Sequence, residues 1–88
     1  MRKLGLIGGM SWQSTAIYYR HMNTIAHERL GGLHSADIVL RSLDFAGIAE
    51  KQHNGDWDGA ADILVAAARD LERAGAEALV LCTNTMHL

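Results

Sequence analysis

Three short apolar segments, separated by stretches long enough for helices, constrain the fold of this 88-residue chain more than any other feature. These segments are residues 3–7, 36–43 and 78–82. Each is too short for an ordinary helix, and the second is rich in β-branched residues, which favours buried strands. The order strand, helix, strand, helix pair, strand predicts an α/β fold of three layers, with a parallel sheet flanked by helices.

The stretches between these segments carry helix signals. Ser11 is placed to cap a first helix, which Gly31 and Gly32 end. Its inner face is predicted to hold Ile17, Met22, Ile25 and Ala26. Residues 45–52 predict a short second helix, and residues 57–74 a third, closed by Gly75. The third helix has an apolar stripe of Ala60, Ile63, Leu64, Ala67, Ala68, Leu71 and Ala74.

Charge and hydropathy exclude several classes of partner. The formal net charge is −2 and the pI about 6.2, so a basic surface for nucleic acid or an anionic membrane is not expected. No apolar run approaches the roughly 20 residues that cross a bilayer. Residues 1–3 lead directly into a strand rather than into a signal peptide. We therefore expect a cytoplasmic protein whose partners are small molecules. The one protein assembly that we consider is a homodimer.

The third apolar segment is followed by only six residues, where a further helix is expected to begin. A three-stranded parallel sheet would leave an edge unpaired and one face incompletely covered. We therefore expect residues 1–88 to form a single, incomplete N-terminal α/β domain.

The candidate site lies beyond the carboxyl ends of the predicted strands, where parallel α/β sheets place their ligands. The most informative stretch there is Cys82-Thr83-Asn84-Thr85-Met86-His87. Its polar side chains follow a buried strand, where a helix N-terminus can hold an anion and a thiol or hydroxyl can transfer a proton. A capping turn with a buried cysteine is the structural alternative. The glycine turn ahead of Ser11 could likewise present backbone N–H groups to a carboxylate.

Other chemistries find little support. The glycines at 5, 8 and 9 lack the G-x-G-x-x-G spacing of dinucleotide sites. The five histidines have no metal-ligand spacing and Cys82 is the only cysteine, so we expect neither a metal site nor an intrachain disulfide. Neither Lys3 nor Lys51 stands where a Schiff-base lysine would, which argues against pyridoxal phosphate.

Four separated motifs carry a family resemblance. They are Gly-Leu-Ile-Gly-Gly-Met-Ser-Trp at 5–12, Arg-Leu-Gly-Gly-Leu-His-Ser at 29–35, Asn-Gly-Asp-Trp at 54–57 and Leu-Cys-Thr-Asn-Thr-Met-His at 81–87. Together, and in this order, they resemble the aspartate/glutamate racemases over the full chain. The resemblance implies two similar α/β domains with the substrate between them, no cofactor, and two bases that serve opposite faces of the α-carbon.

The resemblance also implies roles for individual residues. In most of these racemases the first base is the cysteine of a Cys-Asn-Thr-x-His motif, and the matching register places Thr83 there instead of Cys82. A hydroxyl is a much weaker acid than a thiol, so Thr83 should favour turnover of one enantiomer. The second base would come from the absent C-terminal domain. The residues implied to bind the dicarboxylic amino acid are Met10 with its neighbouring backbone, Gln52, Thr83, Asn84 and Thr85.

Two other functions remain open at this stage. One is a hydantoin racemase or a maleate isomerase-like enzyme, which uses a similar pair of domains. The other is a non-catalytic module that binds a small carboxylate or serves in assembly. A C-terminal half with a second cysteine would favour an enzyme.

Overall fold

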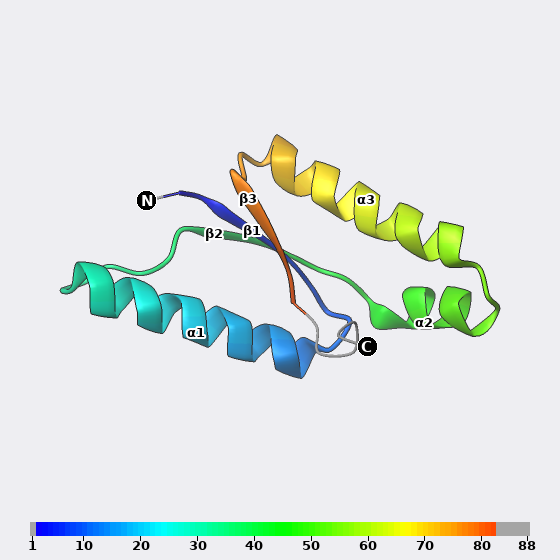
Figure 1. Cartoon of the computed structure of the whole chain (residues 1–88), viewed down its shortest axis with the longest axis horizontal. Coiled ribbons are helices and arrows are strands. Elements are labelled where there is room, and N and C mark those ends of the chain that lie inside the picture. The colour runs from blue at the N-terminus through cyan, green and yellow to red at the C-terminus, as the bar shows by residue number, and fades with distance from the viewer. Residues whose placement is uncertain (1, 83–88) are drawn as a thin grey trace.

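The computed structural model describes residues 2–82, which form a parallel sheet between two helical layers (Figure 1). The strands are β1 (Leu4–Gly8), β2 (Ile38–Ser42) and β3 (Ala78–Leu81). The helices are α1 (Trp12–Leu30), α2 (Phe45–His53) and α3 (Trp57–Arg73). The strand order is β2-β1-β3 and both pairings are parallel. The predicted α/β class and the predicted order of elements are confirmed.

The central strand β1 needs a small residue where α3 approaches it. A Cβ at Gly5 would lie 2.9 Å from the Ala76 Cβ and 2.9 Å from a Leu79 methyl group. Gly5 therefore leaves room for side chains from the chain segment that follows α3. The same contact identifies the α3 face of the sheet, on which Gly5 and Ile7 lie, whereas Leu4, Leu6 and Gly8 face α1 because strand side chains alternate.

The hydrophobic core lies between the sheet, α2 and α3. Its buried members are Ile7, Met10, Leu43, Ile48, Ala60, Ala67 and Leu71. The predicted stripe of α3 is confirmed, since Ala60, Ala67 and Leu71 are buried and Ile63, Leu64 and Ala68 pack against them. Burying a leucine such as Leu71 contributes about 2 kcal/mol. Gly75 follows the end of α3 with φ +96°, a conformation that favours glycine.

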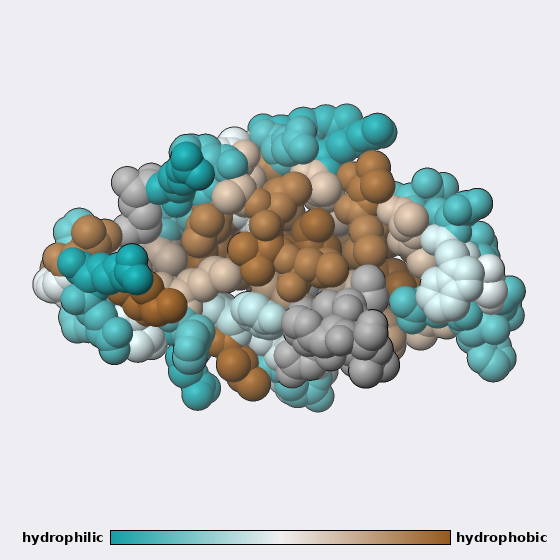
Figure 2. Space-filling model, in the orientation of Figure 1, coloured by the Kyte–Doolittle hydropathy of each residue, from teal (hydrophilic) through white to brown (hydrophobic). Residues whose placement is uncertain are grey.

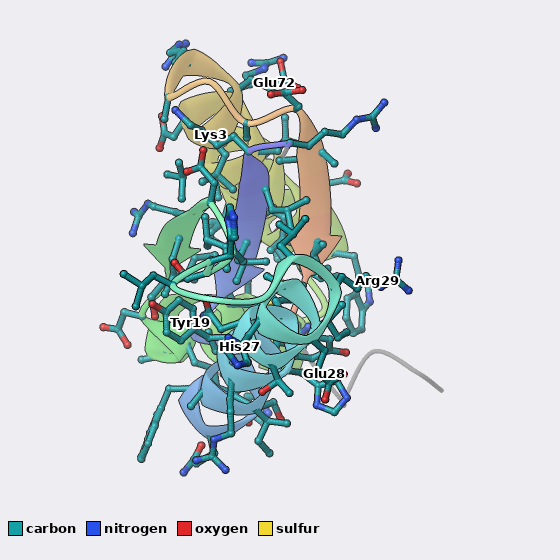
Figure 3. All side chains as sticks on the ribbon, turned by 90° about the vertical axis from the view of Figure 1, so that its left-hand side faces the viewer. Lys3, Tyr19, His27, Glu28, Arg29 and Glu72 are labelled. Atoms are coloured by element: carbon teal, nitrogen blue, oxygen red, sulfur yellow. The ribbon has the colours of Figure 1, made fainter. Side chains whose placement is uncertain are left out.

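The inner face predicted for α1 is partly wrong. Ile17 and Ile25 are 59% and 43% exposed, whereas the buried residues of this helix are Ser14 and Thr15. The later turns of α1 and the sheet leave a groove between them, lined by Leu4, Met22 and Ile25, whereas the first turn packs closely against the chain. His27 and Glu28, which are labelled in Figure 3, are exposed on this helix.

The sheet is incompletely covered at the third strand, as the sequence analysis expects of a three-stranded sheet. Leu79 and Leu81 remain 43% and 38% exposed. β3 lies at the edge of the sheet, and α3 packs mainly on β1 and β2. Within residues 2–82, no helix is long and apolar enough to span a membrane.

Asp56 caps α3 and is expected to make the domain sensitive to acid. Its carboxylate accepts a hydrogen bond of 2.9 Å from the Gly59 backbone N–H and lies 3.5 Å from Lys51 Nζ. The Gly59 hydrogen bond, and then the Lys51 charge, hold the pKa of Asp56 below its usual 3.8. The stabilisation is therefore present above that value and is lost as the pH falls through the lower pKa of the folded state.

Asp56→Asn keeps an oxygen for the cap but removes the titrating carboxylate. We expect the unfolding free energy of this variant to fall less than that of the wild type between about pH 5 and pH 2. Urea titrations across this range measure it. Asp62→Asn removes one exposed charge from the same helix and serves as the control. Identical acid profiles for the wild type and Asp56→Asn would contradict the assignment.

Candidate site at the carboxyl ends of the strands

The carboxyl ends of all three strands meet at one edge of the sheet, beside the start of α1 (Figure 1). The Leu43 N–H, just after β2, donates to the Gly8 carbonyl at 2.8 Å. The Cys82 N–H, just after β3, donates to the Ile7 carbonyl at 2.9 Å. The end of β1 is therefore hydrogen-bonded on both sides. The glycine turn after β1, the start of the segment after β2 and Cys82 lie together at this edge of the sheet.

The turn after β1 requires both of its glycines. Gly9 has φ +91°, and a Cβ there would collide with the carbonyl oxygen of Leu43. A Cβ at Gly8 would lie 2.6 Å from both Oγ1 and Cγ2 of Thr15. The glycines thus let the backbone of the turn lie directly against the chain after β2 and against the first turns of α1.

Thr15 holds this turn through its hydroxyl. Its Oγ1 accepts a hydrogen bond from the Gly9 N–H at 3.0 Å and donates to the Ser11 carbonyl at 3.1 Å. Ser11 caps α1 as predicted, because its side chain accepts from the Ser14 N–H at 3.4 Å. The Gly9 N–H is therefore committed within the protein. Thr15 was not selected from the sequence. The signal available there was a hydroxyl residue one turn after the capping serine.

Cys82 is fully buried, with 0% of its surface exposed. Val80 pairs with Leu6, whose side chain faces α1. Cys82 lies two residues after Val80, so its side chain is on the same face of the sheet. The Sγ lies 3.9 Å from the Val80 carbonyl oxygen. Burial raises the pKa of the Cys82 thiol, because the thiolate is poorly solvated there. Such a thiol stays protonated near neutral pH and is a poor nucleophile.

Met10 lies just after β1 and is buried. The residue is 5% exposed and belongs to the core cluster with Ile7, Leu43 and Ile48. Its side chain therefore serves packing, and the predicted contact between its neighbouring backbone and a substrate stays a prediction.

Gln52 is the penultimate residue of α2 and is half-buried. In Figure 1, α2 begins near the strand ends and leads away from them. A rise of about 1.5 Å per residue puts Gln52 about 10 Å beyond Phe45 along the helix. The structure places Gln52 at the far end of α2, one turn after Ile48, and its contact with a substrate stays a prediction. Asp44, which the sequence reasoning did not select, caps α2 at its near end by accepting from the Ala46 N–H at 3.2 Å.

Thr83, Asn84 and Thr85, the remaining predicted site residues, lie outside the described residues. Among residues 2–82, no three histidine, cysteine or acidic side chains gather into a group that could hold a metal ion.

Comparison with known proteins gives consistent matches. Residues 7–88 match the sequence model of the Asp/Glu/hydantoin racemases. A candidate Asp/Glu racemase from Yersinia pestis has a crystal structure that superposes with a TM-score of 0.95 at 57% sequence identity. An aspartate racemase homologue from Pyrococcus horikoshii superposes with a TM-score of 0.87 at 34% identity. In both cases the match covers 99% of this chain and 38% of the other, so this chain spans well under half the length of these relatives.

Proposed function

Because this chain belongs to the Asp/Glu/hydantoin racemase family, we propose that it supplies one half of the active site of a cofactor-independent racemase of aspartate or glutamate. The observation that carries the proposal is the meeting of three strand ends at the Gly8–Gly9 turn, within the region that matches the racemases. Substrates of parallel α/β sheets bind at such an edge.

The proposed reaction moves one proton from the α-carbon to a base and returns another proton to the opposite face. It requires no oxidant and no leaving group. Thr83 serves one face, and a base outside this chain serves the other. The buried position and raised pKa of Cys82 support this choice, because a thiol packed on the α1 face is not available to a substrate.

The remaining proposed contacts hold the substrate. Asn84 and Thr85 can donate hydrogen bonds to a carboxylate, and the backbone beside Met10 is the proposed contact from the segment after β1. Gln52, near the end of α2, is the remaining proposed contact and would bind the other end of the substrate or its amino group.

The isolated 88-residue chain is expected to show no racemase activity. These 88 residues correspond to 38% of the length of the racemase relatives and on this proposal hold one of the two bases, and a single base cannot exchange the proton on both faces of the α-carbon. The test is incubation of the purified chain with each enantiomer of aspartate and glutamate, followed by chiral chromatography. Formation of the opposite enantiomer at a rate that scales with protein concentration would contradict this expectation.

The function itself is tested with a chimera in which this chain replaces the segment of the Yersinia pestis relative to which it corresponds. At 57% identity the junctions are expected to be tolerated. We expect racemisation of aspartate or glutamate, with one direction faster than the other. A substituted hydantoin and maleate are assayed in parallel. Turnover of either in place of the amino acids would support the alternative enzymes, and tight binding of dicarboxylates without any turnover would support the binding module.

A further inference from the structure

Two hydrogen bonds fix the peptide unit between Gly8 and Gly9. At one end, the Gly8 carbonyl accepts from the Leu43 N–H at 2.8 Å. At the other end, the Gly9 N–H donates to Thr15 Oγ1 at 3.0 Å. A peptide unit is planar, so holding both of its ends fixes the direction in which the chain leaves β1. Of the two contacts, only the one with Thr15 depends on a side chain.

The same hydroxyl also fixes the start of α1. Thr15 Oγ1 donates to the Ser11 carbonyl at 3.1 Å, and the Thr15 backbone N–H donates to that carbonyl at 3.0 Å. A hydroxyl has one proton to donate, and that proton is used within the protein. Thr15 is also 5% exposed. Its hydroxyl is therefore placed to hold the main chain and not to bind a substrate.

The main chain after this fixed peptide has unused donors. Within residues 2–82, the N–H groups of Met10 and Ser11 have no hydrogen-bond partner. The turn from Gly8 to Met10 offers no polar side chain, and Figure 2 shows mostly hydrophobic residues in the middle of the face that carries β3. Polar contacts from this turn to a substrate would therefore come from the main chain, whose direction Thr15 holds.

We propose that Thr15 is a positioning residue of the racemase site, whose hydroxyl holds the Gly8–Gly9 peptide so that the main chain at Met10 and Ser11 binds a substrate carboxylate. This inference rests on the proposed function for the identity of the ligand. Donors that are ordered before binding give higher affinity, because ordering them during binding costs free energy. Without the hydroxyl, the Gly9 N–H loses its buried partner and the peptide is held at its Leu43 end alone.

The test compares three variants of the chimera. Thr15→Val replaces the hydroxyl by a methyl group of similar size, whereas Thr15→Ser keeps the hydroxyl and removes the methyl group. Thr24→Val is the matched control, because Thr24 Oγ1 donates to the carbonyl four residues earlier, that of Arg20, at 2.9 Å on an exposed part of α1. Calorimetric titration with succinate, a dicarboxylate without a stereocentre, measures binding. Initial rates with each enantiomer of aspartate and glutamate give KM and kcat.

We expect Thr15→Val to weaken succinate binding and to raise KM at least about tenfold, within the hundredfold that a misplacement of about 1 Å costs. Thr15→Ser and Thr24→Val should stay within about twofold of the wild type. A role in folding alone would lower the melting temperature of Thr15→Val and leave the affinity and KM of the folded protein unchanged. That result, or equal losses of affinity in Thr15→Val and Thr15→Ser, would overturn the proposal.

A second measurement uses the wild-type chimera, in case Thr15→Val does not fold. Amide NMR spectra are recorded with and without succinate. We expect the Met10 and Ser11 amide resonances to shift on binding, while the Gly9 amide keeps its slow hydrogen exchange because Thr15 retains it. Loss of Gly9 protection on binding, or no response from Met10 and Ser11, would count against the positioning role.

The outcomes separate this inference from the proposed function. A chimera that binds succinate without racemising an amino acid refutes the proposed function alone, and the affinities of the variants still decide the role of Thr15. An active chimera in which Thr15→Val keeps the wild-type affinity and KM refutes the positioning role alone. A chimera with neither binding nor turnover refutes both.

Discussion

Thr83→Ala in the chimera is expected to reduce racemisation by about 10²–10⁴-fold, the usual contribution of a positioned proton-transfer group. Our reason is that Thr83 is the proposed base for one face of the α-carbon, and alanine leaves no exchangeable proton there. Initial rates in both directions, with each enantiomer as substrate, measure the effect. Circular dichroism confirms that the variant is folded.

Cys82→Ala is the matched control for the neighbouring position. The thiol is fully buried on the α1 face, so its removal should leave most activity and lower stability by about 1 kcal/mol through a small cavity. Thr83→Cys should make the two directions of turnover more equal, because a thiol would then stand at the proposed first position. If Cys82→Ala is folded but inactive while Thr83→Ala keeps its activity, the register is wrong and Cys82 is the base.

Gly9→Ala is expected to destabilise the domain by more than about 3 kcal/mol, enough to unfold much of the isolated chain. Two costs act together. The backbone at φ +91° disfavours any residue with a Cβ, and the added carbon would collide with the Leu43 carbonyl oxygen. The three atoms nearest to the added carbon, O, N and C of Leu43, all belong to the backbone, which cannot move aside without breaking the Leu43–Gly8 hydrogen bond.

Gly32→Ala separates these two costs. Gly32 also has a positive φ, +57°, but a Cβ there meets nothing within 4 Å. We therefore expect a loss of only about 1 kcal/mol from backbone strain. Urea unfolding of the two variants gives the comparison. Similar losses at Gly9 and Gly32 would show that the close approach to Leu43 contributes little to stability.

The meeting of the strand ends could be predicted from the chain direction, whereas the substrate contacts could not be derived from it. Parallel strands place their carboxyl ends at one edge, so the meeting of Gly8, Leu43 and Cys82 was predictable. Gln52 was assigned to the site by resemblance, and its role stays a prediction because helix periodicity does not say how the end of α2 lies relative to that edge. The predicted roles of Thr83, Asn84 and Thr85 stay predictions, because these residues lie outside those described.

Sequence by itself determined the α/β class, the order of the six elements, the cap at Ser11 and the buried stripe of α3, because each follows from local spacing and backbone preferences. Only the tertiary structure decided the strand order β2-β1-β3, and with it the exposure of Leu79 and Leu81. It also decided that Thr15, rather than Ile17, is buried against the glycine turn. These outcomes depend on which elements pack together across the chain, and hydrophobic periodicity within one segment carries no information about its partner.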